Sequence, residues 1–360
     1  MTPRRPSIHH PAATPVVAPE PAADLPRAGP TTDDPTVRGD GRTEYDGESE
    51  FPRLGAPPST REWHLQVAVT LLLVAGPVLG LLLAIVLAWG RGVGPVDLVL
   101  LVALYVVTGL GIAVGYHRGL THRSYASGPV LRAVLASAGA MAFEGDPVSW
   151  VATHRRHHAF TDRPGDPHSP YRFGTGAWAQ TRGLVDAHIG WLFRHDETDP
   201  DHWAPDLVAD PAVRMVARLF PVLCVVSLLV PFGLGLAITG TVSGALLTLL
   251  WAGLVRVALL QHVTWSVNSL CHVFGSRPFV TRPHDRATNL WPLAIPSFGE
   301  SWHNAHHADP TCARHGVDRG QVDIAAWVIR GFERLGWVRD VRWPGTHRPP
   351  ERRPVEIDLR

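Results

Sequence analysis

The chain has 360 residues and a formal net charge of +1, from 33 basic and 32 acidic side chains. A nucleic-acid-binding protein would carry a basic excess, so this balance excludes nucleic acid as an expected partner. The three cysteines are scattered and form no CxxC pair, which argues against a disulfide framework and a thiolate metal site. All basic residues are arginine, as in GC-rich bacterial genes, and the unusual count is 20 histidines.

The first 62 residues are rich in Pro, Ala, Asp and Arg and show no apolar periodicity, so we expect a disordered tail. This tail lacks the apolar core and small-residue cleavage site of a signal peptide. We expect a membrane domain at residues 63–345 and a flexible C-terminal tail at residues 346–360.

Four long apolar segments predict membrane-spanning helices at residues 64–89, 93–115, 216–240 and 241–263. Each can cross roughly 30 Å of hydrocarbon, and the short links within each pair predict two hairpins. The remaining segments, 116–215 and 264–345, would form a helical cap on one side. The expected fold is an all-α integral membrane protein whose cap carries a histidine-rich dinuclear metal site. A shorter apolar block, 130–143, is interrupted by Arg132 and predicts an interfacial or re-entrant helix.

Arginine is concentrated in the N-terminal tail, in segment 116–215 and after the fourth span. Because positive charge favours the cytoplasmic side, we expect both termini and the cap to face the cytoplasm. The expected location is the bacterial inner membrane, as a multi-pass protein.

Four histidine-bearing segments adjoin these spans: "HRGLTH" (117–122), "HRRHH" (154–158), "NSLCH" (268–272) and "HNAHH" (303–307). On a helix, His157 and His158 would point about 60° and 40° to either side of His154, so neighbouring ions could each take one. The i, i+5 spacing of His117 and His122 fits an α-helix less well, and Gly119 suggests that the helix ends between them.

A single HxxHH pattern is also typical of an exposed polar face, and lone histidines such as His168 and His315 are typical of surface or hydrogen-bonded positions. Together, however, the four segments supply nine imidazoles, which exceeds the coordination of one ion and indicates two metals. Imidazole alone does not choose among Zn, Cu, Fe and Ni. Nearby acids would orient the rings or be exposed charges: Asp146, Asp162, Asp166, Asp285, Glu300 and Asp309.

These motifs resemble those of the membrane fatty acyl desaturases, in particular the acyl-CoA Δ9 group that includes stearoyl-CoA desaturase. The resemblance covers residues 63–343 and includes the flanking words "GDPHSP", "HIGWLF" and "SFGESWHNAHH". It implies two iron ions cycling between Fe2+ and Fe3+, with no catalytic residues beyond their ligands. One iron would be held by His117, His122, His154, His158 and His307, and the other by His157, His272, His303, His306 and, through a water, Asn268.

The activity that the resemblance implies is O2-dependent insertion of a cis double bond, at Δ9, into a saturated long-chain acyl-CoA in lipid biosynthesis. The sequence contains no HPGG haem-binding motif of a fused cytochrome b5, no CxxC pair of a rubredoxin and no nucleotide-binding motif. Electrons would therefore come from an external donor, a ferredoxin-like or flavin iron–sulfur reductase.

The resemblance also implies a bent acyl tunnel, with Trp150, Thr264 and Trp265 at its kink and Tyr105 and Gly109 as candidates for setting chain length. Glu144 stands where the family usually has Gln, and it would face either the tunnel or solvent. Two explanations are open for five arginines of the predicted cap. They would either bind the phosphates of the substrate head group or be present only because cytoplasmic loops are rich in arginine. These residues are Arg123, Arg155, Arg156, Arg172 and Arg182.

Two alternatives remain open. A di-iron hydroxylase of lipids or alkanes would share the histidine boxes, with different spacing between them. A histidine-lined metal transporter would carry ionisable residues along its spans, whereas here only Arg256 lies deep and the histidines fall outside the predicted spans.

Overall fold

The computed structural model describes residues 54–91, 93–345 and 351–353. Most of the two predicted tails lies outside these residues, so the domain boundaries stay a prediction. The short described segment 351–353 pairs with the chain near Phe279: Val280 N donates to Glu351 O (2.8 Å) and Arg353 N to Pro278 O (2.9 Å).

Within the described ranges, four helices are long and apolar enough to cross a membrane: Thr60–Ala88, Pro95–Thr121, Phe220–Thr239 and Val242–His272. They correspond to α1 (Thr60–Arg91), α2 (Pro95–Leu110) with a π-helix (Gly111–Thr121), α9 (Phe220–Thr239), and α10 (Val242–Thr248), a second π-helix (Leu249–Val255) and α11 (Arg256–Ser269). The four predicted spans and the all-α membrane fold are therefore confirmed.

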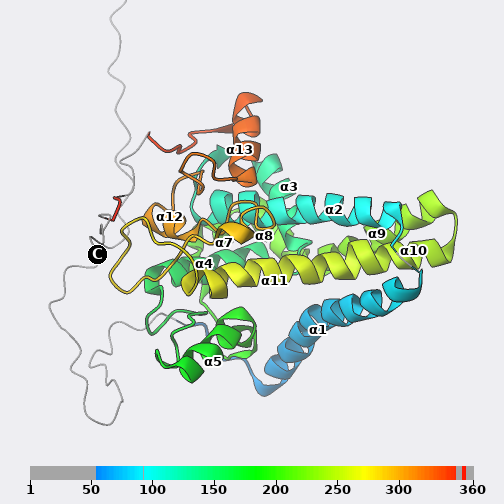
Figure 1. The fold of residues 1–360 in the computed structure, drawn as a ribbon, viewed down its shortest axis with the longest axis horizontal. Helices are drawn as coiled ribbons and strands as arrows, with labels where there is room; N and C mark the ends of the chain where they lie inside the picture. The colour runs from blue at the N-terminus through cyan, green and yellow to red at the C-terminus, as the bar shows by residue number, and fades with distance from the viewer. Residues whose placement is uncertain (1–53, 92, 346–350, 354–360) are drawn as a thin grey trace, which may run out of the picture. The chain divides into compact units, whose positions relative to one another are not determined.

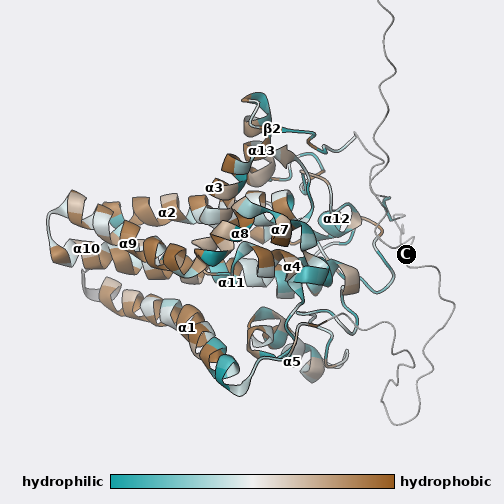
Figure 2. Ribbon diagram, turned by 180° about the vertical axis from the view of Figure 1, so that it is seen from behind, coloured by the Kyte–Doolittle hydropathy of each residue, from teal (hydrophilic) through white to brown (hydrophobic). Residues whose placement is uncertain are grey.

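Both hairpin turns lie at one end of this bundle, while α4 (Pro147–Phe160) and α12 (His303–Ala308) lie at the other (Figure 1). The helices of the bundle are hydrophobic along their length and the polar segments gather at the α4–α12 end, which we call the cap (Figure 2). Local chemistry determines the second turn: Gly240 ends α9 at φ 67°, and Thr241 accepts a hydrogen bond from Gly244 N (3.1 Å).

The second and fourth spans extend further than predicted, to Thr121 and His272 rather than to residues 115 and 263. The apolar pattern stops at the predicted ends, but the cap encloses the polar turns that follow, so the helices continue while buried. His117 and His272 consequently lie on the span helices themselves. The expectation that all the histidines fall outside the spans is wrong in this respect.

Short elements complete the cap. α3 (Pro129–Ala140) forms within the predicted interfacial block and packs against the first π-helix so closely that a Cβ on Gly111 would overlap the backbone of Gly139. The remaining helices are α5 (Ala177–His188), α6 (Pro200–Trp203), α7 (Pro205–Ala209), α8 (Pro211–Arg218) and α13 (Ile324–Arg334), with 3-10 turns at Gly190–Phe193, Leu270–His272 and Trp291–Leu293. Strand β1 (Ala126–Ser127) pairs antiparallel with β2 (Val338–Arg339).

Arg256, the deep charge noted in the fourth span, is fully buried and ties three segments together. Its guanidinium donates to Met141 O (2.9 Å) and to Ser227 Oγ (2.6 Å) and O (3.3 Å). The charge therefore serves helix packing between α11, α9 and the segment after α3, rather than forming an ion path.

Replacing Arg256 with Leu should destabilise the folded bundle, because each buried carbonyl left without a donor costs about 1–3 kcal/mol. Thermal unfolding of the detergent-purified protein measures this, and the midpoint should fall by several degrees. Arg61→Leu, at an exposed position, is the matched control and should leave the midpoint unchanged. An equal midpoint for both variants would contradict the packing role.

Candidate metal centre

The structure brings the nine predicted histidines together in two adjacent groups. Within each group, the candidate ligand nitrogens all lie within 4.8 Å of one another. The first group contains His117, His122, His154, His158 and His306, and the second contains His157, His272, His303 and His307.

The π-helix explains the HxxxxH spacing. His122 N donates to His117 O (3.1 Å), an i, i+5 hydrogen bond that closes a π turn and leaves the two rings 4.9 Å apart. The spacing that fits an α-helix poorly therefore suits this helix. Gly119 does not end it, because the helix continues to Thr121.

The two HxxHH boxes follow one rule. His154 and His158 on α4 share a group, with their Nε2 atoms 3.1 Å apart, while His157 joins the other group. On α12 the i, i+4 pair is His303 and His307, whose Nε2 atoms are 3.0 Å apart. All three positions lie on one helix face, but i+4 lies about 40° to one side of position i and i+3 about 60° to the other, so the two adjacent rings diverge.

This rule corrects the assignment carried over from the resemblance, which placed His307 with the first group and His306 with the second. In the structure His306 Nε2 lies 3.0 Å from both His117 Nε2 and His158 Nε2, whereas His307 belongs with His303. The set of nine is unchanged, but these two neighbours exchange places.

Four carboxylates orient the rings from behind. The Nδ1–H groups of three histidines donate to Asp166 (His157, 3.0 Å), Asp162 (His272, 2.8 Å) and Asp285 (His307, 2.9 Å), and His117 Nδ1 contacts Glu300. An N–H committed on Nδ1 leaves Nε2 as a lone-pair ligand, as in metal sites generally.

Two of the six flanking acids do not contact the candidate ligands. Asp146 caps α4 by accepting from Val148 N (2.9 Å) and Ser149 N (3.1 Å), and Asp309 accepts from the Thr311 hydroxyl (3.1 Å). Sequence position alone therefore did not separate ring-orienting acids from capping acids.

Burial favours the neutral form of six of the imidazoles. It lowers the pKa of each of six candidate ligands outside the spans below the ordinary value, and neighbouring histidines lower it further; these residues are His122, His154, His158, His303, His306 and His307. Among the described residues, the buried Nε2 atoms of His122 and His157 have no hydrogen-bond partner. Neutral rings that converge on two points with unsatisfied lone pairs fit two first-row metal cations.

His168 and His315, expected at the surface or in ordinary hydrogen bonds, are instead buried beside the groups. The His168 ring stacks on His157 at 4.3 Å, and the His315 ring lies 4.4 Å from His306. Neither nitrogen of His315 has a hydrogen-bond partner among the residues that the structure describes. Both residues stand alone in the sequence without a box around them, so no spacing signal identified them.

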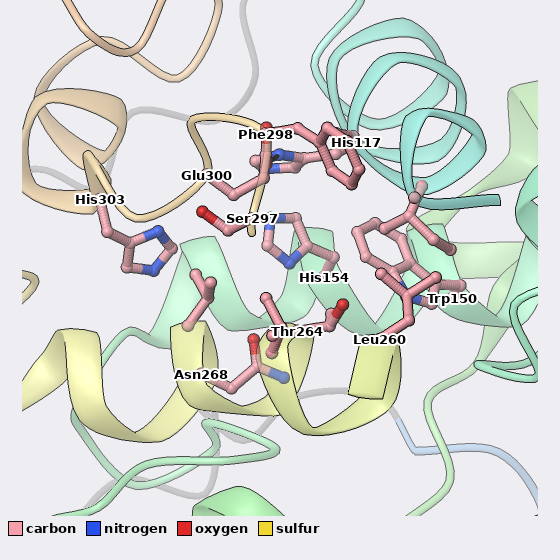
Figure 3. A pocket seen from close by; sticks show the side chains of 15 residues that line it. His117, Trp150, His154, Leu260, Thr264, Asn268, Ser297, Phe298, Glu300 and His303 are labelled. Carbon is pink, nitrogen blue, oxygen red and sulfur yellow. Dashed lines mark hydrogen bonds and ion pairs between the residues drawn. The ribbon is translucent and has the colours of Figure 1, made fainter. Parts of the chain in front are cut away.

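Two cavities meet beside the metal centre. An outer cavity of ≈ 600 Å³ runs from the start of α1 to α4 and α11, and an inner cavity of ≈ 40 Å³ lies against His117, His154 and His303. Both are lined by Trp150, His154, Thr264 and Asn268, which Figure 3 shows converging from α4 and α11.

The predicted substrate residues occupy distinct positions. Trp150 and Thr264 lie where the cavities meet, whereas Trp265 lines only the outer one and Gly109 only the inner one. Tyr105 lines neither cavity; its hydroxyl donates to Pro296 O (2.7 Å) behind the inner one.

Glu144 lines the outer cavity, which favours the tunnel-facing alternative over solvent. Burial raises the pKa of its carboxyl to about 8, against the opposing effect of nearby Thr264 and Trp150. The group is therefore largely protonated at neutral pH and leaves the cavity wall uncharged.

The arginines of the second box bind protein rather than standing free. Arg155 bonds Asp206 (2.5 Å) and Leu120 O (2.9 Å), and Arg156 bonds Gly165 O (2.9 Å) and Asp196 O (3.0 Å). They lock α4 to the segments around it, so neither is available for a head group.

Comparison with known proteins agrees with this site. The model of the fatty acid desaturase family matches residues 95–330. The chain belongs to the fatty acid desaturase family. Among curated desaturase relatives, it is 40% identical over 270 residues to "Hex-5-enoyl-[acyl-carrier protein] acetylenase" of Moorena producens, covering 74% of this chain and 84% of that protein.

Two plant relatives have similar coverage. "Delta-9 acyl-lipid desaturase 1" of Arabidopsis thaliana is 39% identical over 247 residues (67% of this chain, 73% of the relative). "Acyl-CoA C20 Delta5-desaturase" of Anemone leveillei is 37% identical over 249 residues (67% and 72%). The chain is thus a member of the membrane fatty acid desaturase family, whose members are oxidoreductases of fatty acyl chains, and the predicted resemblance is confirmed at family level.

Replacing Asp285 with Asn should weaken metal binding about ten- to a hundredfold, because the His307 ring loses its charged orienting partner. Metal content after dialysis against a graded chelator series measures this. Asp309→Asn removes a carboxylate that lies two residues after His307 and forms no hydrogen bond to a candidate ligand, and this variant should bind metal as the wild type does. If both variants hold metal equally, the orienting role is wrong.

Glu144→Gln should retain activity at neutral pH, because the native carboxyl is already mostly uncharged there. Raising the pH through about 8 ionises the native group and places a charge in the cavity, so wild-type activity should fall while the variant loses less. Paired pH profiles of product formation test this. Superimposable profiles would show that Glu144 ionisation does not affect turnover.

Proposed function

We propose that the protein is an O2-dependent, di-iron desaturase that inserts a cis double bond, at Δ9, into a saturated long-chain acyl-CoA for lipid biosynthesis. One observation carries the proposal: nine clustered imidazoles form two adjacent groups, and His117, His154 and His303 from these groups line a cavity whose other walls are mainly apolar. Family membership supplies the acyl substrate class.

The donor set suits iron, for which imidazole is a normal ligand. The nine histidines would hold two iron ions, with Asn268 near the second group acting through a water. When bound, the iron pair supplies oxidising power from O2 that can break unactivated C–H bonds, for which protein acid–base groups are inadequate.

The overall reaction balances without any group from the protein. Two neighbouring methylenes lose one hydrogen each, and O2 takes up these hydrogens with two further protons and two electrons to give two waters. The two electrons must come from outside the chain, and we propose a ferredoxin-like or flavin iron–sulfur reductase that docks on the cap.

The protein's own contribution is to position the acyl chain beside the metal centre and to exclude water from it. Trp150 stacks on His154 with ring centroids 5.0 Å apart, so an acyl chain that passes this indole lies beside a candidate ligand. Apolar side chains such as Ile112 and Leu260 line the inner cavity and hold methylenes in place.

The relatives' names include acyl-carrier protein, acyl-lipid and acyl-CoA substrates, so the carrier is a separate part of the proposal. We propose acyl-CoA, delivered at the cytoplasmic face of the bacterial inner membrane. The test supplies the purified enzyme with the same acyl chain attached in turn to CoA, to a lipid and to acyl-carrier protein. Faster turnover of the lipid or carrier-protein form would show that CoA is not the preferred carrier.

Product identity decides between desaturase and hydroxylase. Expression in a desaturase-deficient bacterium, followed by gas chromatography and mass spectrometry of total fatty acids, should show a cis-monounsaturated acid. Hydroxylated chains in its place would establish the hydroxylase. A metal transporter has no support from family membership.

His157→Ala and His306→Ala, one from each group, should each abolish the product while the protein still inserts in the membrane, because loss of either iron ends oxidation. His202→Ala, at an exposed histidine, is the control and should keep wild-type product levels. Wild-type unsaturation in either box variant would refute the two-iron site.

A further inference from the structure

The lining of the inner cavity includes an aromatic residue that the boxes did not identify. Phe298 lies in the segment between the 3-10 turn Trp291–Leu293 and α12, and its ring lines the cavity close to His117 and Glu300 (Figure 3). Only 4% of its surface is exposed. This aromatic ring forms part of the wall on the side of α2 and the π-helix.

The backbone holds the ring at this place. Phe298 adopts φ 58° and Gly299 φ 102°, and left-handed geometry at a bulky residue persists only where surrounding contacts enforce it. Phe298 O accepts a hydrogen bond from Ala325 N (3.0 Å), and the ring packs against Tyr105 at 5.7 Å. Tyr105 in turn donates to Pro296 O, which anchors the same segment to α2.

Gly109 on α2 is the complementary position. A Cβ there would overlap the Phe298 ring, so only glycine lets the ring lie against the helix. The sizes of the two residues are therefore linked. A larger side chain at position 109 must push the Phe298 ring into the cavity. A smaller side chain at position 298 must open space toward Tyr105.

We propose that Phe298 is the stop for the methyl end of the acyl chain, so that it limits how many carbons extend past the metal centre. The proposal rests on the proposed function and adds to it a specificity-determining residue from the loop before the third box. The inner cavity has a volume of only ≈ 40 Å³, against ≈ 600 Å³ for the outer one, so a small change in chain length should decide whether the methyl end fits. A hydrophobic pocket of this kind discriminates about 10- to 200-fold per methylene.

The experiment uses the full-length protein in a desaturase-deficient bacterium fed an equimolar series of saturated fatty acids from laurate to arachidate. The host loads these onto its own carriers, so the result does not depend on the carrier. The readout is the chain-length distribution of unsaturated products. Phe298→Leu and then Phe298→Ala should shift the distribution stepwise to longer chains, with about a tenfold or greater gain in the ratio of longest to native product.

Gly109→Ala should act in the opposite sense and lose the longest products, because the new Cβ displaces the ring into the cavity. Combining Gly109→Ala with Phe298→Ala should restore them. This reciprocal rescue keeps the test valid even if one single variant folds poorly. Phe332→Ala, at a ring on α13 that packs against the core away from both cavities, should leave the distribution unchanged.

Each outcome has a distinct meaning. If the wild type makes unsaturated acids but all Phe298 and Gly109 variants share its chain-length distribution, the stop is elsewhere and the inference is wrong. If Phe332→Ala shifts the distribution equally, the effect is general loosening, which also overturns it. If the wild type makes no unsaturated acid at all, the proposed function itself fails.

Discussion

Nine clustered imidazoles, most of them buried, must be aimed at two points, and this requirement determines much of the cap. A protonated ring in this cluster would be repelled by its neighbours and poorly solvated, and burial accordingly lowers the pKa of the ligands outside the spans. Neutral rings, however, can rotate or change tautomer. The carboxylates on Nδ1 remove that freedom, so the charges sit behind the rings and the lone pairs face the metals.

The carboxylates that orient the rings are themselves held in place, and the backbone near them has uncommon conformations. Asp162 adopts φ 56° directly after α4, where its oxygens accept from His272, Arg286 N (2.9 Å) and the Ser169 hydroxyl (3.0 Å). Glu300 is held by Arg118 at 2.9 Å, and His117 and Arg118 lower its pKa against the opposing effect of burial. The π-helix that aligns His117 with His122 is a third irregularity at the same place. Strained geometry thus gathers where orientation matters most.

Much of this was predictable from the sequence, for physical reasons that also explain what was missed. Long apolar blocks specify spans because hydrocarbon requires them, and the HxxHH spacing separates His157 from His154 and His158 because a helix has a fixed period. The extension of α2 to Thr121 was not predictable from the apolar pattern, because it depends on burial by the cap. The grouping of His306 and His307 needed the orientation of a short helix, and the inward positions of His168 and His315 depend on contacts distant in sequence.

The same loop serves the metal centre and the end of the substrate cavity. Phe298 and Glu300 are two residues apart across Gly299, whose Cβ position would overlap Asp323, so the segment has little freedom to adjust one residue without moving the other. A change at Phe298 that shifts the backbone would also shift Glu300 and the ring of His117. Gly109 lies on α2 two turns before the first ligand and meets the Phe298 ring from the helix side. A larger residue at 109 acts on the cavity through the Phe298 ring, so the size of the cavity and the position of Glu300 are coupled through this one short loop.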